Sequence, residues 1–177
     1  MNNIPLRPPL SFISILYLVF AIGLTVGATV LGGLMTDISM PWYKAILKKP
    51  WFNPPNLAFP IAWTLLYTFM AFSFWRILRL PAGVIGRGQA ITAFLIQLGF
   101  NVLWSFLFFY KQDPATALLE VICLLTAILF MIVSFRPVDR LSYYLMWPYA
   151  AWVSFAAILN LAIVALNPNM QTLWNRF

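Results

Sequence analysis

Residues 113–136 read DPATALLEVICLLTAILFMIVSFR, and between Asp113 and Arg136 the only charged side chain is Glu120. A helix needs about 20 mostly apolar residues to cross a bilayer, and Ala115–Phe135 has that length. Aspartate followed by proline, as in Asp113-Pro114, is typical of a helix N-cap and the first position of a helix. The stretch therefore predicts a membrane-spanning helix with a defined start.

Four further apolar runs have the length of a membrane span: Leu10–Leu34, Leu57–Leu80, Gln89–Tyr110 and Leu141–Leu166. The first run exceeds the apolar core of a signal peptide and follows a single basic residue, Arg7, so we expect it to be a permanent span. The short links between later runs predict antiparallel neighbours. The sequence thus predicts an all-α integral membrane protein, a five-transmembrane-helix bundle that forms one domain over residues 1–177.

The composition excludes an ordinary soluble domain. The chain is 63% hydrophobic and 8% charged, whereas soluble domains are roughly 45–50% apolar and about 25% charged. The net charge of +7 comes from Lys and Arg residues at the edges of the apolar runs. This arrangement is typical of anchors at the lipid headgroups and not of a nucleic-acid interface.

The basic residues do not choose an orientation in the membrane. One side would hold six of them: Arg7, Arg76, Arg79, Arg87, Arg136 and Arg140. The other side would hold five: Lys44, Lys48, Lys49, Lys111 and Arg176. The positive-inside rule needs a clearer bias than this. We expect a multi-pass protein of a bacterial membrane, with either orientation open.

Small residues lie four apart in the first run, as Gly23-x-x-x-Gly27 and Ala28-x-x-x-Gly32. Such spacing lets another helix backbone approach closely. The partner can be a neighbouring helix of the same bundle or a helix of a second copy of the chain. The pattern alone leaves both interpretations open.

Polar residues inside two of the runs indicate a site or an interhelical contact. Gln97, Asn101 and Trp104 share a face of the third span. In the fifth span one face carries Trp152, Phe155, Ala156, Leu159 and Asn160. Polar side chains in hydrocarbon usually face the bundle interior and mark functional sites. Hydrogen bonding between helices, without any ligand, is the alternative.

Tryptophans lie too deep in the spans to belong to an interfacial belt. Trp63, Trp104 and Trp152 are near the middle of three different runs. Their ring faces suit a planar, conjugated ligand, and an asparagine or glutamine can orient such a ligand. Pro148 removes one backbone hydrogen bond from the fifth span, so we expect a kink that opens space between the helices.

The remaining polar groups give no catalytic constellation. Glu120 is expected near the interface or paired with a basic loop residue, and Cys123 on the same face is expected in the core. The chain has no histidine, and it has no phosphate loop, nucleophile elbow or paired carboxylates. The sequence therefore predicts neither catalytic residues nor a metal site, and it leaves a receptor and a small transporter as alternatives.

Several motifs in order make the chain resemble the TspO/MBR family, the tryptophan-rich sensory proteins, translocator proteins and peripheral-type benzodiazepine receptors. The motifs are Trp42-Tyr43-Lys44, Leu47-Lys48-Lys49-Pro50, Asn53-Pro54-Pro55, Trp63-Thr64-Leu65-Leu66-Tyr67, Asn101-Val102-Leu103-Trp104-Ser105, Pro148-Tyr149-Ala150-Ala151-Trp152 and Leu159-Asn160. The resemblance extends over about residues 23–167. It implies five helices around a pocket that the first loop, residues 35–56, closes.

The resemblance also implies ligands and residues. The ligands would be tetrapyrroles such as porphyrin or haem, isoquinoline and benzodiazepine drugs, and in animal members cholesterol, with no cofactor required and with homodimers as the common assembly. By position, the pocket residues would be Tyr43, Trp63, Asn101, Trp104, Cys123, Trp152, Ala156 and Leu159. Asn101 would supply a hydrogen bond and the tryptophans ring contacts.

The chain departs from the family pattern in two motifs, and these departures limit the ligands and contacts that the resemblance implies. The family's Lys-Pro-Ser-Trp is here Lys49-Pro50-Trp51-Phe52, and Leu161 replaces the tyrosine of the animal cholesterol motif. A haem could not be held through histidine. Sensing, transport of porphyrin and light-dependent porphyrin degradation remain alternatives, and the last would use Tyr43, Trp63 and Trp152 as redox-active residues.

Overall fold

The computed structural model describes residues 10–168, and within this range the regular structure is helical. The elements are α1 (Phe12–Ile38), α2 (Met40–Ala45), α3 (Ala58–Leu78), α4 (Arg87–Ser105), the π-helical η1 (Phe106–Tyr110), α5 (Pro114–Phe135), α6 (Arg140–Leu145) and α7 (Trp147–Leu166). Five segments are long and apolar enough to cross a membrane, which confirms the predicted spans. Arg7 and Arg176 lie outside the described residues.

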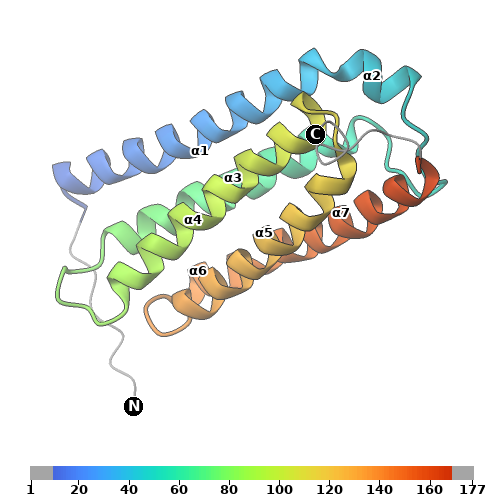
Figure 1. Cartoon of the computed structure of the whole chain (residues 1–177). Coiled ribbons are helices and arrows are strands. Elements are labelled where there is room, and N and C mark those ends of the chain that lie inside the picture. The colour runs from blue at the N-terminus through green and yellow to red at the C-terminus, as the bar shows by residue number, and fades with distance from the viewer. Residues whose placement is uncertain (1–9, 169–177) are drawn as a thin grey trace.

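The spanning helices run side by side along one axis, and α2 lies across one end of the bundle (Figure 1). α1 packs against α3 and α4, α5 packs against α4 and α7, and α6 packs against α3 and α5. The antiparallel pair α4 and α5, joined by the predicted short link, has the most extensive contact of all. We call the end of the bundle that α2 covers the lid end.

The predicted N-cap of the fourth span is present. The Asp113 carboxylate accepts a hydrogen bond from the Thr116 backbone N–H at 3.0 Å and another from the Thr116 hydroxyl at 2.7 Å. Pro114 occupies the first turn, where its missing N–H costs nothing. The helix therefore begins where the sequence predicts it.

The first connection differs from the predicted loop 35–56. α1 continues to Ile38, and a second helix, α2, begins at Met40 with Pro41 in its first turn. The hydroxyl of Ser39, between the two helices, donates to the carbonyl of Phe109 at 2.7 Å. This bond anchors the start of α2 to η1, because Ser39 is buried and its hydroxyl has to find a partner.

The fifth span is divided, although not as the sequence predicts. The break lies at Met146, between α6 and α7, and Pro148 stands in the first turn of α7. Met146 is fully buried among the core side chains. The proline thus starts a new helix, and the expectation that the kink opens space between the helices stays a prediction.

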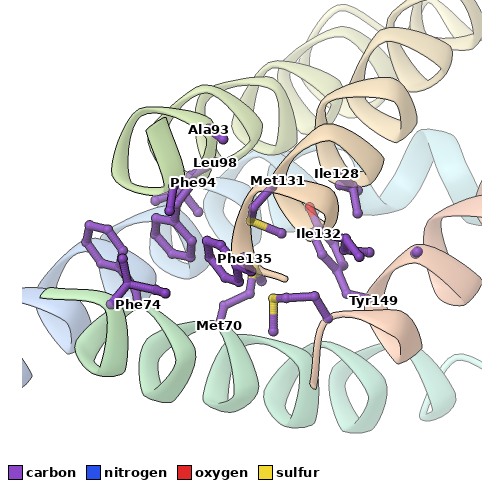
Figure 2. Packing of buried hydrophobic residues seen from close by; sticks show 14 of the residues in the cluster. Met70, Phe74, Ala93, Phe94, Leu98, Ile128, Met131, Ile132, Phe135 and Tyr149 are labelled. Atoms are coloured by element: carbon purple, nitrogen blue, oxygen red, sulfur yellow. The ribbon is translucent and has the colours of Figure 1, made fainter. Parts of the chain in front are cut away.

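Away from the lid end the bundle is filled by apolar side chains (Figure 2). The rings of Phe74 and Phe94 stack with centroids 4.0 Å apart, and Met70, Met131 and Phe135 are fully buried around them. Gln97 is also fully buried here, with its amide nitrogen 3.9 Å from the Met70 sulfur. Its role is therefore interhelical packing in this core.

An ion pair fastens the end of the bundle opposite the lid. Arg76 of α3 donates two hydrogen bonds to Asp139, at 2.7 and 3.0 Å, and Ser142 of α6 donates a third at 2.6 Å. Asp139 is buried, so its charge depends on these donors. The pair fixes α6 against α3.

The two pairs of small residues in α1, Ala28 with Gly32 and Gly23 with Gly27, lie on different sides of the helix. A Cβ at Gly32 would lie 3.2 Å from the Ser105 hydroxyl oxygen, so α1 and α4 approach closely there, and Ala28 is buried in the bundle. Gly23 and Gly27 are exposed, and a Cβ on either would meet nothing within 4 Å. The interpretation as packing within the bundle is therefore wrong for Gly23 and Gly27, which face outward.

We expect Asp139→Ala to destabilise the bundle, because the Arg76 guanidinium would lose two hydrogen bonds to its acceptor and the Ser142 hydroxyl would lose the shorter of its two. The cost should be about 1–3 kcal/mol, seen as a lower unfolding midpoint of detergent-solubilised protein followed by circular dichroism. Arg140→Ala is the matched control, since Arg140 is exposed next to Asp139. Equal midpoints for the two variants would contradict the role of the ion pair.

Candidate functional site

A cavity of about 440 Å³ lies inside the bundle next to the lid end. Side chains from α1, α2, α3, α4, η1 and α7 form its wall. Ligand sites typically have volumes of roughly 300–1,000 Å³, so this space suits a small organic molecule. It adjoins the packed core of Figure 2, because Trp63, Trp104 and Trp152 line the cavity and also pack against that core.

The structure brings seven of the eight predicted pocket residues to this cavity: Tyr43, Trp63, Asn101, Trp104, Trp152, Ala156 and Leu159. They come from four different helices, so the predicted helix faces do converge. Contact with a ligand is not shown by this placement and stays a prediction for each of them.

Cys123 is the exception, and its predicted place in the pocket or the core is wrong. The side of α5 that faces the bundle carries Val121, Leu124 and Ile128. Cys123 immediately precedes Leu124, so it points about 100° away around the helix, and it is exposed on the outer surface. Glu120 is buried, and in the described part of the chain neither of its oxygens has a hydrogen-bond partner, so the predicted pairing with a loop residue is also wrong.

Aromatic rings form two walls of the cavity. On one side Trp63 lies against Tyr67 with centroids 5.5 Å apart, and Phe59 meets Trp152 edge to face at 6.0 Å. On the other side Trp104 stacks on Phe108 at 5.0 Å. The rings hold one another in place, so the cavity is bounded by ordered apolar faces.

Asn101 sits at the boundary between the cavity and the packed core, where it joins three helices. Its carbonyl oxygen accepts a hydrogen bond from the Tyr67 hydroxyl of α3 at 2.5 Å. Its amide nitrogen donates to the Tyr149 hydroxyl of α7 at 3.0 Å. Asn101 is therefore a positioning residue first, because both ends of its amide already have protein partners. Tyr67 follows Trp63 by four residues, a spacing that could have placed it at the site.

Asn160, the second polar residue at the cavity, also joins helices. With its amide oriented to satisfy both groups, the nitrogen donates to the Pro114 carbonyl at 3.1 Å. The oxygen then accepts from the Leu118 backbone N–H at 3.0 Å. This amide joins α7 to the first turn of α5. The alternative given above for the polar residues, hydrogen bonding between helices, is therefore correct for Asn160.

The segment between α2 and α3, residues 46–57, closes the end of the cavity, and we call it the lid. The Tyr43 hydroxyl donates to the Asn53 side chain at 3.1 Å, and the Lys49 ammonium donates to the Tyr43 carbonyl at 2.6 Å. Burial raises the pKa of Tyr43 above its usual value, although the Asn53 hydrogen bond acts in the opposite direction. The hydroxyl is therefore protonated at neutral pH and remains a donor to Asn53.

A single side chain fastens the lid to α7. Asn167 accepts a hydrogen bond from the Lys48 backbone N–H at 3.1 Å and donates to the Lys48 carbonyl at 2.9 Å. The same amide also donates to the Ile163 carbonyl at 2.7 Å. In Figure 1 the chain after α2 descends to the end of α7, which is where this clip forms. Asn167 is not among the residues predicted from the sequence.

The wall of the cavity is mainly apolar and aromatic. Within residues 10–168 no three metal-ligating side chains gather, and Asp37 at the rim is the only carboxylate among the cavity residues. Apolar and aromatic walls with a few polar groups at the edge favour a largely apolar guest.

We expect Asn101→Ala to lower the free energy of unfolding, because Tyr149 is fully buried and would lose its hydrogen-bond partner. The loss should be about 1–3 kcal/mol, measured by thermal or chaotrope unfolding without any ligand. Asn56→Ala, at the exposed rim of the same cavity, is the control and should leave stability unchanged. Wild-type stability in Asn101→Ala would show that this amide does not hold the three helices together.

Comparison with known proteins places the chain in one family. The sequence profile of the TspO/MBR family matches residues 16–166. The tryptophan-rich protein TspO of Chlorobaculum tepidum is 34% identical over 154 residues, which cover 87% of this chain and 98% of that protein. The tryptophan-rich sensory protein of Cereibacter sphaeroides is 37% identical over 135 residues, 76% of this chain and 78% of that protein.

An animal protein matches as well. The translocator protein of Sus scrofa is 28% identical over 149 residues, 81% of this chain and 87% of that protein. The names of these relatives, together with the five spans, support a general role as a membrane sensor or translocator. The chain is a multi-pass integral membrane protein, and it belongs to the TspO/MBR family.

Proposed function

We propose that this protein is a membrane receptor that binds a planar, largely apolar ligand in the cavity at the lid end. The preferred class is the tetrapyrroles, porphyrin or a haem-like molecule, and compact aromatic drugs of the isoquinoline and benzodiazepine type would use the same space. The observation that carries the proposal is the convergence of Trp63, Trp104 and Trp152, from three helices, on one cavity.

The geometry of the walls supports a flat guest. Rings on opposite sides of the cavity are fixed by their own aromatic neighbours, so they can offer faces or edges to a conjugated ligand without a large loss of side-chain entropy. A haem would be held by stacking and shape, since the chain has no histidine to ligate its iron. Carboxylates on a tetrapyrrole would face the lid end, where α2 carries Lys44 and the lid carries Lys48 and Lys49.

Transport is the alternative function, and the packed core counts against a continuous path. Beyond Asn101 the bundle is filled by Met70, Phe74 and Phe94, all fully buried (Figure 2). A guest would have to displace these side chains to cross. Light-dependent degradation of porphyrin is a further alternative, in which Trp152→Phe should slow product formation under light.

We expect Trp152→Ala to weaken binding of protoporphyrin IX. Removing a large buried ring contact costs roughly 1.5–3 kcal/mol, which corresponds to about a 10- to 100-fold higher Kd. The measurement is titration of tryptophan fluorescence quenching with purified protein in lipid nanodiscs.

Trp147→Ala is the matched control for this titration. Trp147 lies on the same helix, exposed and outside the cavity, so its loss should leave the Kd unchanged. The proposal would be contradicted by absent quenching in the parent protein, or by equal Kd values for the two variants.

We propose further that the protein forms a homodimer through the outward face of α1. Gly23 and Gly27 leave open space on that face, and small residues four apart allow close helix contact in a bilayer. Gly27→Leu should therefore increase the monomer fraction in chemical crosslinking of membranes. Gly99→Leu, on an exposed and equally open position of α4, should not. A dimer that is insensitive to Gly27→Leu would place the interface elsewhere.

A further inference from the structure

We propose that the ligand reaches the cavity sideways from the bilayer, through an opening between α1 and α3, while the lid stays closed. This inference rests on the proposed binding function and adds the source and class of the ligand. The guest would be a molecule that dissolves in the membrane before it binds.

The opening is marked by cavity residues that are also exposed on the outer surface. On α1 these are Thr29, Gly33 and Asp37, and at the start of α3 they are Asn56, Pro60 and Thr64. The α1 residues have the spacing i, i+4, i+8 and so form one edge along that helix. Pro60 and Thr64 are likewise four apart on α3, and Asn56 extends this second edge into the last turn of the lid, just before the helix. Two such edges, one on each helix, are what a slot between α1 and α3 requires.

The position of α1 explains why a gap exists there. A Cβ at Gly32 would lie 3.2 Å from the Ser105 oxygen, so α1 leans closely on α4 at this level. Gly33, the next residue, lines the cavity and is exposed, and a Cβ on it would meet nothing within 4 Å. Close packing on one side of α1 thus accompanies open space on the other.

The gap is confined to the half of the bundle near the lid. Toward the other end, the Trp75 indole N–H of α3 donates to the Ser14 carbonyl of α1 at 2.9 Å. Phe20 and Phe74 also meet between the same two helices, with centroids 6.3 Å apart. α1 and α3 are therefore joined at one end and separated at the other.

The lid end offers no comparable path. The Lys48 backbone is held to Asn167 by two hydrogen bonds, and Tyr43 is held to Asn53 by one. Leu47 is buried against the apolar side chains of α7, including Leu159 and Ile163. A ligand that came from water would have to break these contacts first.

The length and polarity of the two edges also indicate what kind of ligand the slot would admit. Eight residues of helix extend about 12 Å, so the slot runs from the level of Asp37 and Asn56, near the lid, well into the hydrocarbon. Its deep end carries Thr29 and Thr64. The Thr29 hydroxyl donates to the Thr25 carbonyl of its own helix, and the Thr64 carbonyl accepts from the Thr68 hydroxyl. An apolar body with a polar group at one end fits such a slot.

The test closes each path covalently and compares ligand exchange. In a Cys123→Ala background, Gly33→Cys and Thr64→Cys are bridged across the slot by bifunctional methanethiosulfonates of graded length. In the control, Lys48→Cys and Asn167→Cys are oxidised to a disulfide that locks the lid. Proteoliposomes carry protoporphyrin IX dissolved in the membrane, and the rate of tryptophan quenching reports association.

Bridging the slot should slow association and release by about tenfold or more, and reduction of the bridge should restore both rates. Oxidising the lid pair should leave the rates of that variant equal to those of its own reduced form. The proposal is overturned if the bridged slot exchanges ligand at the unbridged rate, or if the locked lid stops exchange. An unbridged protein without saturable quenching would contradict the proposed function itself, which separates the two failures.

Discussion

The amide of Asn101 is the contact on which the arrangement of this bundle depends. In hydrocarbon a polar side chain has no water to bond, so it must find partners on neighbouring helices. Asn101 takes them from α3 and α7 through the hydroxyls of Tyr67 and Tyr149. Below this junction stacked phenylalanines and methionines fill the interior (Figure 2). Above it the helices enclose the cavity, so one side chain separates a packed half from a hollow half.

The hollow half persists because its boundaries are tied independently of any guest. Ser39 fastens the start of α2 to η1, Asn160 fastens α7 to α5, and Asn167 fastens the lid to α7. Each of these bonds lies at the edge of the cavity and leaves the aromatic faces unoccupied. A preformed site of this kind lowers the ordering cost of binding. Along the cavity α1 approaches α4 closely at Gly32, whereas its hydrogen bond and ring contact with α3 lie toward the other end of the bundle.

Much of this could be predicted from the sequence, for reasons that differ from residue to residue. The spans and the Asp113 cap follow from hydropathy and local hydrogen bonding, which depend on neighbouring residues alone. The helical spacing of Trp152, Ala156 and Leu159 predicted a common face, and the structure places all three at the cavity. The predicted position of Cys123 was wrong, because neither the resemblance to the family nor the spacing from Glu120 determines how α5 is rotated about its axis. The hydrogen bonds of Asn167 and Tyr149 could not be predicted, since their partners lie 119 and 48 residues away in sequence.

The central claim is that a planar guest lies in the hollow half, between the aromatic walls and above Asn101. A structure of the protein in nanodiscs with protoporphyrin IX tests it most directly. The account predicts density for the macrocycle inside the cavity, in contact with the rings of Trp63, Trp104 and Trp152. Macrocycle density on the lipid-facing surface of the bundle, with those three rings unchanged and the cavity empty, would contradict it.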